Sequence, residues 1–206
     1  MYVSKVPGFF WRLFPGLLWR VPVNDRSLFL TFDDGPIPDV TDYVLETLDE
    51  YNARATFFCL GKNVAAHPSL YDEIKSRGHA VVNHTHHHLN GWETDDEVYY
   101  DDIAECAKLV KSNLFRPPYG KISLAQINYL KPQYKIVMWD VLSGDFDQTR
   151  SPDACLKNVL RNTREGSIIV MHDSAKAKLT LTYALPRILE FFTAGGYRFT
   201  SLQYGN

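Results

Sequence analysis

The sequence contains few cysteines and no block of basic residues. Its three cysteines, Cys59, Cys106 and Cys155, are scattered over 206 residues without any CxxC spacing. An odd, sparse set argues against a disulfide framework and against a cysteine-based zinc site. Lysine and arginine total 22 and aspartate and glutamate total 24, so the formal net charge is −2. Without a basic stripe, a nucleic-acid partner is not expected.

A long, uninterrupted apolar stretch is also lacking. The aromatic residues 9–20 are broken by an arginine and a proline, and no small-residue cleavage site follows. This stretch is too short for a transmembrane helix and is a poor secretory signal. We therefore expect residues 1–26 to pack on the domain and the protein to be cytoplasmic. The alternative, which we do not favour, is peripheral membrane contact flanked by Lys5, Arg12 and Arg20.

Strand-like and helix-like stretches alternate through the rest of the chain, and the length fits one domain. Apolar runs predict strands, and 3.6-residue periodicity predicts the helices between them. The expected strands are residues 28–32, 55–60, 80–83, 114–116, 134–140, 167–171 and 197–202, and the expected helices are 40–51, 68–77, 95–111, 123–130, 151–162 and 181–192. This alternation predicts a parallel sheet covered by helices, either doubly wound or barrel-like.

Two neighbouring carboxylates close the first expected strand. Asp33 and Asp34 stand directly before Gly35 and Pro36. Adjacent carboxylates repel each other, and a fold tolerates them when a metal or a cationic side chain compensates their charge. The alternative is an ordinary solvated turn, since aspartate, glycine and proline are typical turn residues.

Polar residues also follow the other expected strands, and the carboxyl ends of parallel strands meet at one edge of a sheet. These residues are His84 in a His-Thr-His-His-His run, Arg116, Asp140, Asp145, His172 and Asp173.

The histidine run suggests a metal site. His84 and His88 have the i, i+4 spacing that places two side chains on one side of a helical turn. Two histidines and a carboxylate form a ligand set of catalytic zinc sites. The alternative is a hydrogen-bonded core histidine. We expect His86 and His87 to be bystanders.

Two further polar residues have candidate roles. Pro117 and Pro118 stiffen the backbone beside Arg116, whose guanidinium could pair with a carboxylate, although it could also be a surface cation. His172 follows a buried strand and suits proton donation to a leaving group, with a core histidine as the alternative.

The ordered motifs resemble the polysaccharide deacetylase (NodB-like) family, carbohydrate esterase family 4. They are TFDDGP at residues 31–36, HTHHH at 84–88, RPPYG at 116–120 and VMH at 170–172. Each motif alone is weak evidence, but the ordered set is specific. The resemblance covers the chain from about residue 28 to near its end, so residues 27–206 are expected to form the catalytic domain.

The resemblance implies a distorted (β/α) barrel with about seven parallel strands. It also implies one divalent metal, for which we expect Zn²⁺, with Co²⁺ or Ni²⁺ as alternatives. Carried over by position, the implied roles are Asp33 as general base, Asp34, His84 and His88 as metal ligands, Arg116 as the partner of Asp33, His172 as general acid, and the Tyr119 backbone N–H as an oxyanion donor.

The fourth motif departs from the family pattern. Where the family commonly shows D-x-x-D-W, this chain has LSGDF, so Leu142 replaces the first aspartate and Phe146 replaces the tryptophan. We expect Asp145 to be the partner of His172, with Asp140 as the second candidate.

The implied reaction is metal-dependent hydrolytic N-deacetylation of N-acetylglucosamine-type units in a chitin-like or peptidoglycan-like oligo- or polysaccharide. Trp92, Tyr119 and Trp139 are expected to contact this N-acetylated carbohydrate substrate. One alternative is an allantoinase-like amidohydrolase acting on a small non-sugar amide. Another is a non-catalytic sugar-binding protein. The sequence makes no prediction of oligomeric state.

Overall fold

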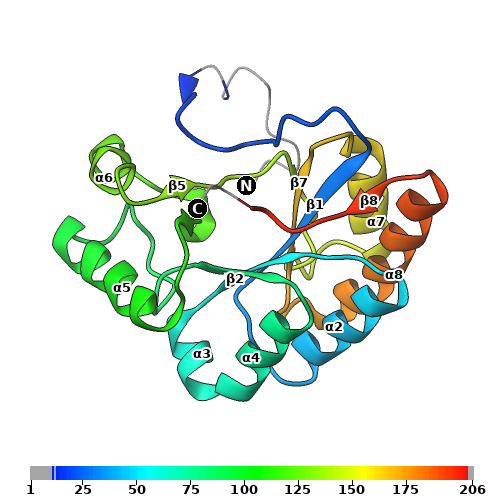
Figure 1. Ribbon diagram of the computed structural model, residues 1–206, viewed down its shortest axis with the longest axis horizontal. Helices are drawn as coiled ribbons and strands as arrows, with labels where there is room; N and C mark the ends of the chain where they lie inside the picture. Colours follow the sequence, from blue (N-terminus) through cyan, green and yellow to red (C-terminus); the bar gives the residue numbers. More distant parts are fainter. Residues whose placement is uncertain (1–10, 12, 204–206) are drawn as a thin grey trace.

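Strands and helices alternate along the chain in the computed structural model, which describes residue 11 and residues 13–203. Figure 1 shows the strands at the centre with the helices around them. The elements, in order, are β1 Ser27–Asp33, α2 Val40–Glu50, β2 Thr56–Cys59, α3 Gly61–Ala66, α4 Pro68–Ser76, β3 Ala80–Asn83, α5 Asp96–Leu109, β4 Leu114–Phe115, the 3₁₀ helix η1 Pro118–Gly120, α6 Leu124–Leu130, β5 Lys135–Ile136, β6 Val141–Leu142, α7 Pro152–Asn162, β7 Ile168–His172, α8 Lys178–Ala194 and β8 Arg198–Phe199.

The strands form one curled sheet in the order β5-β4-β3-β2-β1-β7-β6, with β8 paired to β1. Every ladder in it is parallel. The predicted α/β barrel fold is therefore confirmed. The expected strand at 134–140 is reduced to the two residues of β5, which pair with β4, and β6, a short strand that was not expected, follows it and pairs with β7. One stretch of chain thus joins the two edges of the sheet.

The side chains of strand β1 alternate between the two faces of the sheet. Successive side chains of a strand point to opposite faces. Leu28, Leu30 and Phe32 pack into the core between sheet and outer helices, whereas Phe29 packs into the cluster inside the barrel. The same alternation directs Asp33 inward at the carboxyl end of the strand.

The chain before β1 passes from the end of β5 to the start of β7 (Figure 1). Leu18 forms a bridge with Val137, and Arg20 forms one with Ser167. The side chains of Leu17 and Trp19 are buried, and Trp19 packs beside β5 and α6 residues. We call residues 17–20 the strap.

Part of the N-terminal segment that was expected to pack on the domain, residues 1–10 and 12, lies outside the described residues. The same is true of Lys5 and Arg12, which belong to the membrane contact that was not favoured. In the part of the chain that the structure describes, no helix has both the length and the apolar character needed to cross a bilayer.

Two local predictions were wrong. Helix α3 was not expected, because six residues with two buried positions give no readable periodicity. Helix α5 begins after Asp95, whose side chain accepts a hydrogen bond from the Glu97 N–H, and not after Thr94. The Asp95 hydrogen bond decides where α5 begins.

Candidate active site

The turn after β1 presents Asp34 at the mouth of the barrel. Asp34 has a left-handed backbone conformation, with φ of 83°, and the Gly35–Pro36 peptide is cis. The Asn63 side-chain amide donates to the Asp34 carbonyl at 2.6 Å. The Gly35 N–H donates to the Asp173 carboxylate at 3.0 Å, and a Cβ at Gly35 would collide with that carboxylate. Only glycine fits this close approach.

Asp34, His84 and His88 form a cluster with the geometry of a metal site. One ligand atom from each lies within 4.8 Å of the others. Asp34 Oδ1 is 3.8 Å from His84 Nε2 and 3.2 Å from His88 Nε2. Ligands that share a tetrahedral zinc at 2.0–2.1 Å are separated by about 3.3 Å, so these distances fit.

The chemistry of these groups also fits a cation. Asp34 Oδ1 is buried and, among the described residues, has no well-directed hydrogen bond. Burial opposes ionisation of Asp34, but the His88 contact and the nearby His172 and His84 outweigh it and lower its pKa well below the usual range. The residues present therefore suit a divalent ion that takes Oδ1 as a ligand.

The hydrogen bonds of His84 prepare one ring nitrogen for a metal. Its Nδ1 lies 2.8 Å from the Arg116 carbonyl, which can only accept, so Nδ1 donates and Nε2 keeps its lone pair. Burial lowers the pKa of His84 to about 4, outweighing the nearby carboxylates. The ring is therefore neutral near pH 7, as metal ligation requires.

His84 and His88 do not share a helical turn, contrary to the reasoning from their spacing. Thr85 and His88 have φ of 67° and 65°, which is left-handed. The Thr85 hydroxyl accepts from the His88 N–H at 2.9 Å, and the Asn83 side chain accepts from the Thr85 N–H at 2.8 Å. This folded loop brings the two ring centroids to 5.2 Å.

Asp33 is held by Arg116 inside the barrel. Arg116 Nη1 donates to Asp33 Oδ1 at 2.6 Å and to the Thr31 hydroxyl at 2.8 Å. The guanidinium is fully buried, stacks 3.7 Å from the Phe58 ring centroid, and donates to the Met138 carbonyl at 3.0 Å. Burial lowers the Arg116 pKa, while Asp33 acts to raise it. This buried ion pair leaves Asp33 Oδ2 on the side of His84 Nε2, 3.9 Å away.

His172 is paired with Asp145. The His172 ring Nδ1 lies 2.8 Å from Asp145 Oδ1, and the His172 backbone N–H donates to Asp145 Oδ2 at 2.8 Å. Burial by itself lowers the pKa of His172, but the Asp145 charge and hydrogen bond raise it to about 9. The second candidate, Asp140, lies elsewhere and accepts from the Ser167 hydroxyl at 2.6 Å.

Comparisons with known proteins identify the family of this chain. The family model for polysaccharide deacetylase matches residues 20–133. The chain belongs to the polysaccharide deacetylase family. It is accordingly a hydrolase with the NodB-like fold of carbohydrate esterase family 4.

Three relatives illustrate the similarity. A peptidoglycan-N-acetylglucosamine deacetylase of Bacillus cereus is 34% identical over 191 residues, which is 89% of this chain and 90% of the relative. A chitooligosaccharide deacetylase of Azorhizobium caulinodans is 35% identical over 162 residues, or 75% of this chain and 77% of the relative. A solved peptidoglycan N-acetylglucosamine deacetylase, in complex with an N-hydroxybenzamide derivative, superposes with a TM-score of 0.87 at 31% identity, covering 96% of this chain and 95% of that one.

The aromatic residues expected to contact substrate differ in exposure. The side chains of Trp92 and Tyr119 are open to solvent, at 65% and 62% exposed, and the Tyr119 ring centroid is 4.5 Å from that of His88. Trp139 is partly buried, packs against two hydrophobic clusters and lies 6.0 Å from the Arg116 guanidinium. Trp92 and Tyr119 thus offer accessible ring faces, whereas Trp139 forms the wall behind Arg116.

Asp173 is a further residue of the site, for which the sequence pattern predicted no role. It is fully buried and accepts from the Gly35 N–H and, at 2.6 Å, from the Thr41 hydroxyl. Burial raises its pKa to about 8, so this carboxyl is largely protonated near pH 7. Its position directly after His172 at a strand end was the available signal. Asp173 joins the turn after β1 to α2.

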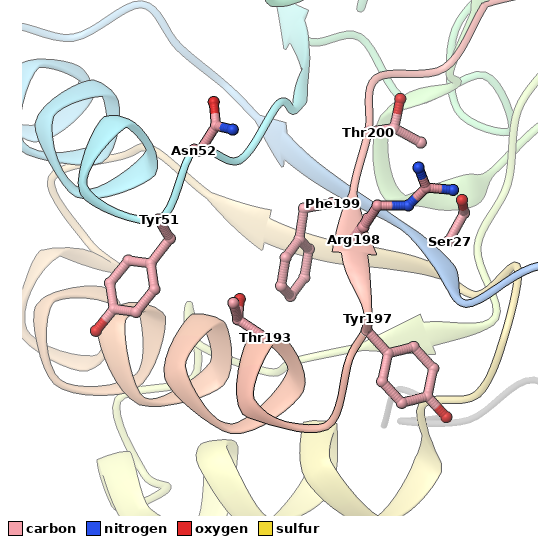
Figure 2. A pocket seen from close by; sticks show the side chains of 8 residues that line it. All are labelled: Ser27, Tyr51, Asn52, Thr193, Tyr197, Arg198, Phe199 and Thr200. Atoms are coloured by element: carbon pink, nitrogen blue, oxygen red, sulfur yellow. The ribbon is translucent and has the colours of Figure 1, made fainter.

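The hollow shown in Figure 2 lies away from this site. Its volume is about 490 Å³, and it is lined by Ser27, Tyr51, Asn52, Thr193, Tyr197, Arg198, Phe199 and Thr200. Ser27 begins β1 whereas Asp33 ends it, so the hollow lies at the opposite end of the sheet, about 20 Å away along the strand. None of the proposed catalytic side chains lines it.

Proposed function

We propose that this protein is a metal-dependent N-deacetylase acting on N-acetylglucosamine-type units of a peptidoglycan-like or chitin-like oligo- or polysaccharide, with release of acetate. The relatives named above act on such carbohydrates according to their names. One observation carries the proposal. The Asp34, His84 and His88 cluster lies beside a carboxylate held by Arg116, and the register partner of that carboxylate on the neighbouring strand is a histidine held by Asp145.

Asp34, His84 and His88 would hold one divalent ion, for which we propose Zn²⁺, with Co²⁺ or Ni²⁺ as alternatives. Such an ion supplies Lewis acidity to the acetyl carbonyl and makes a nearby water more acidic. His84 and His88 offer nitrogen ligands and Asp34 offers oxygen, a set that suits these metals.

Asp33 and His172 would carry the two proton transfers. The water oxygen bonds to the amide carbon while Asp33 accepts a proton from that water. Arg116 keeps the Asp33 carboxylate oriented. The C–N bond then breaks, and His172, protonated because its pKa is about 9, donates a proton to the leaving amine nitrogen. The products are acetate and an amino sugar.

Tyr119 is proposed to have two roles in this reaction, one for its backbone N–H and one for its ring. Its backbone N–H would donate to the oxyanion that develops on the acetyl oxygen. Its left-handed backbone conformation, with φ of 59°, belongs to the stiff turn that follows Arg116. Its exposed ring, with that of Trp92, would stack on the sugar.

Acetate release from N-acetylglucosamine oligomers, peptidoglycan fragments and small non-sugar acetamides tests the proposal. We expect release from the carbohydrates in the presence of zinc and its loss after chelation. Release from small amides but not from carbohydrates would refute the sugar substrate. Unchanged release after complete metal removal would refute the metal.

A further inference from the structure

A second cluster of metal-ligating side chains lies beside the catalytic loop. His86, His87 and Glu105 each place one ligand atom within 4.8 Å of the other two. We propose that these residues bind a second divalent transition-metal ion, such as Zn²⁺. The site is distinct from the Asp34, His84 and His88 cluster, and the proposed deacetylation does not require it.

His87 is prepared for ligation by a buried carboxylate. Asp102 Oδ1 lies 2.6 Å from His87 Nδ1, and Asp102 Oδ2 accepts from the backbone N–H groups of His86 and His87 at 2.8 and 2.9 Å. A carboxylate only accepts, so Nδ1 carries the proton and Nε2 keeps its lone pair. Metal-binding histidines commonly have such a carboxylate on the other nitrogen. Asp102 is 6% exposed, whereas the His87 side chain is 55% exposed.

His86 points its remaining nitrogen towards Glu105. Its Nδ1 is buried against Gly61, where a Cβ would collide with it, and it has no hydrogen-bond partner within residues 13–203. Its Nε2 lies 3.8 Å from Glu105 Oε1, which is too long for a hydrogen bond. Two ligands of one tetrahedral zinc lie about 3.3 Å apart, so a bound ion would fit between these atoms after a small adjustment.

The ligand set identifies the metal class. Two imidazoles and one carboxylate favour Zn²⁺, Ni²⁺ or Cu²⁺ over Mg²⁺ or Ca²⁺, which prefer oxygen ligands. The side chains of His87 and Glu105 are half exposed, so solvent fills the remaining positions and the affinity is lower than at the buried cluster. Occupancy would join the loop at 84–88 to α5, because Glu105 belongs to that helix.

Zinc titration of tag-free, chelator-treated full-length protein tests the site, with calorimetry as the readout and Zn²⁺ as the probe. We expect two equivalents per chain for the wild type, one tight and one weaker. His87→Gln and Glu105→Gln should each weaken the second equivalent by at least about 10-fold and leave the first in place. Asp101→Asn, which removes an exposed carboxylate from the same helix, should keep both equivalents.

Two results would overturn the proposal. One is a single equivalent in the wild type. The other is a second equivalent that survives in both His87→Gln and Glu105→Gln, which would identify adventitious surface binding. His84→Ala should remove the tight equivalent and keep the weaker one, so failure of the proposed catalytic metal and failure of this second site give different titrations.

Discussion

Asp33 and His172 are register partners on the parallel strands β1 and β7. A side chain fixed by its own ion pair stands at each position, with Arg116 beside Asp33 and Asp145 beside His172. The sheet ladder, and not a loop, therefore sets the distance between the proposed base and the proposed acid. Catalytic groups on regular strands are held more accurately than groups on loops.

Replacing Asp33 with asparagine should remove the base and keep the shape of the site. We expect Asp33→Asn to lower the rate of acetate release by about 10²–10⁴-fold, the usual contribution of a positioned base. Bound metal, measured by elemental analysis, should stay near the wild-type content because Asp34 is intact. Loss of the Asp33 charge leaves Arg116 buried without its ion-pair partner, so thermal stability should fall. A fully active variant would show that another group is the base.

Replacing Asp145 with asparagine should move the pH profile. His172 acts as an acid only while protonated, and Asp145 contributes most to raising its pKa to about 9, with smaller contributions from Asp34 and Asp33. Without that charge, burial lowers the pKa, so the proton is lost at lower pH. We expect the alkaline limb of the kcat profile of Asp145→Asn to move to lower pH. Asp140→Asn is the matched control and should leave that limb in place.

Single substitutions in the histidine loop, residues 84–88, should distinguish the proposed metal ligand His84 from its neighbour His86. His84→Ala removes a buried ligand of the proposed catalytic cluster, so tightly bound metal and acetate release should both be lost. His86→Ala should keep the tightly bound metal, because His86 contacts Glu105 and not Asp34. Zinc content after gel filtration at limiting zinc distinguishes the two. Equal loss in both variants would show that the loop, and not the ligand, had failed.

The role of Asp173 should appear as a contrast between two substitutions. Asp173→Ala leaves the buried Gly35 N–H and Thr41 hydroxyl without their acceptor, which costs about 1–3 kcal/mol for each group. Asp173→Asn keeps one oxygen that can accept from the Gly35 N–H, and its NH2 group can donate to the Thr41 hydroxyl oxygen. We expect the alanine variant to unfold at clearly lower urea concentration and to lose activity, and the asparagine variant to stay close to wild type. Equal unfolding midpoints would rule out this role.

His79 should make stability depend on pH. It is 6% exposed, its Nδ1 accepts from the Ala55 N–H, and burial lowers its pKa to about 4. An unfolded histidine has a pKa near 6.5, so the unfolded chain binds the proton first. Stability therefore falls as pH drops from about 6.5 to about 4, by about 3 kcal/mol from this group.

The matching variant is His79→Asn, which keeps an acceptor for the Ala55 N–H and does not titrate. Its free energy of unfolding, measured in urea at several pH values, should vary less over that window than that of the wild type. An unchanged difference between the two proteins at pH 7 and pH 4.5 would contradict the assignment.

Much of this architecture could be predicted because the strands are buried on both faces. Near-continuous apolar runs such as that of β1 are typical of parallel strands buried on both faces, and the polar residues after them mark one edge of the sheet. The shortening of the expected strand at 134–140 to β5, and the separate strand β6 that follows it, could not be predicted. They arise because Lys135 pairs with β4 and Val141 pairs with β7, which depends on the curl of the whole sheet.

The residues of the candidate site could be predicted from the sequence, but the backbone conformation that brings them together could not. The spacing of His84 and His88 suggested a helical turn, but left-handed residues and the Thr85 and Asn83 side chains bring the rings together. Backbone conformations of this kind leave no clear pattern in a single sequence, since threonine rarely adopts them. The role of Asp173 could not be predicted for a similar reason, because its partners Gly35 and Thr41 are far from it in sequence.

The strap has a consequence for the solution behaviour of shortened chains. Leu18 donates to the Ile136 carbonyl and accepts from the Met138 N–H, at 2.9 and 2.8 Å, so it occupies main-chain groups that a sheet edge would otherwise present. Unpaired edges recruit strands from other molecules. A chain that starts after Arg20 would carry an exposed pairing template, and self-association would compete with its folding.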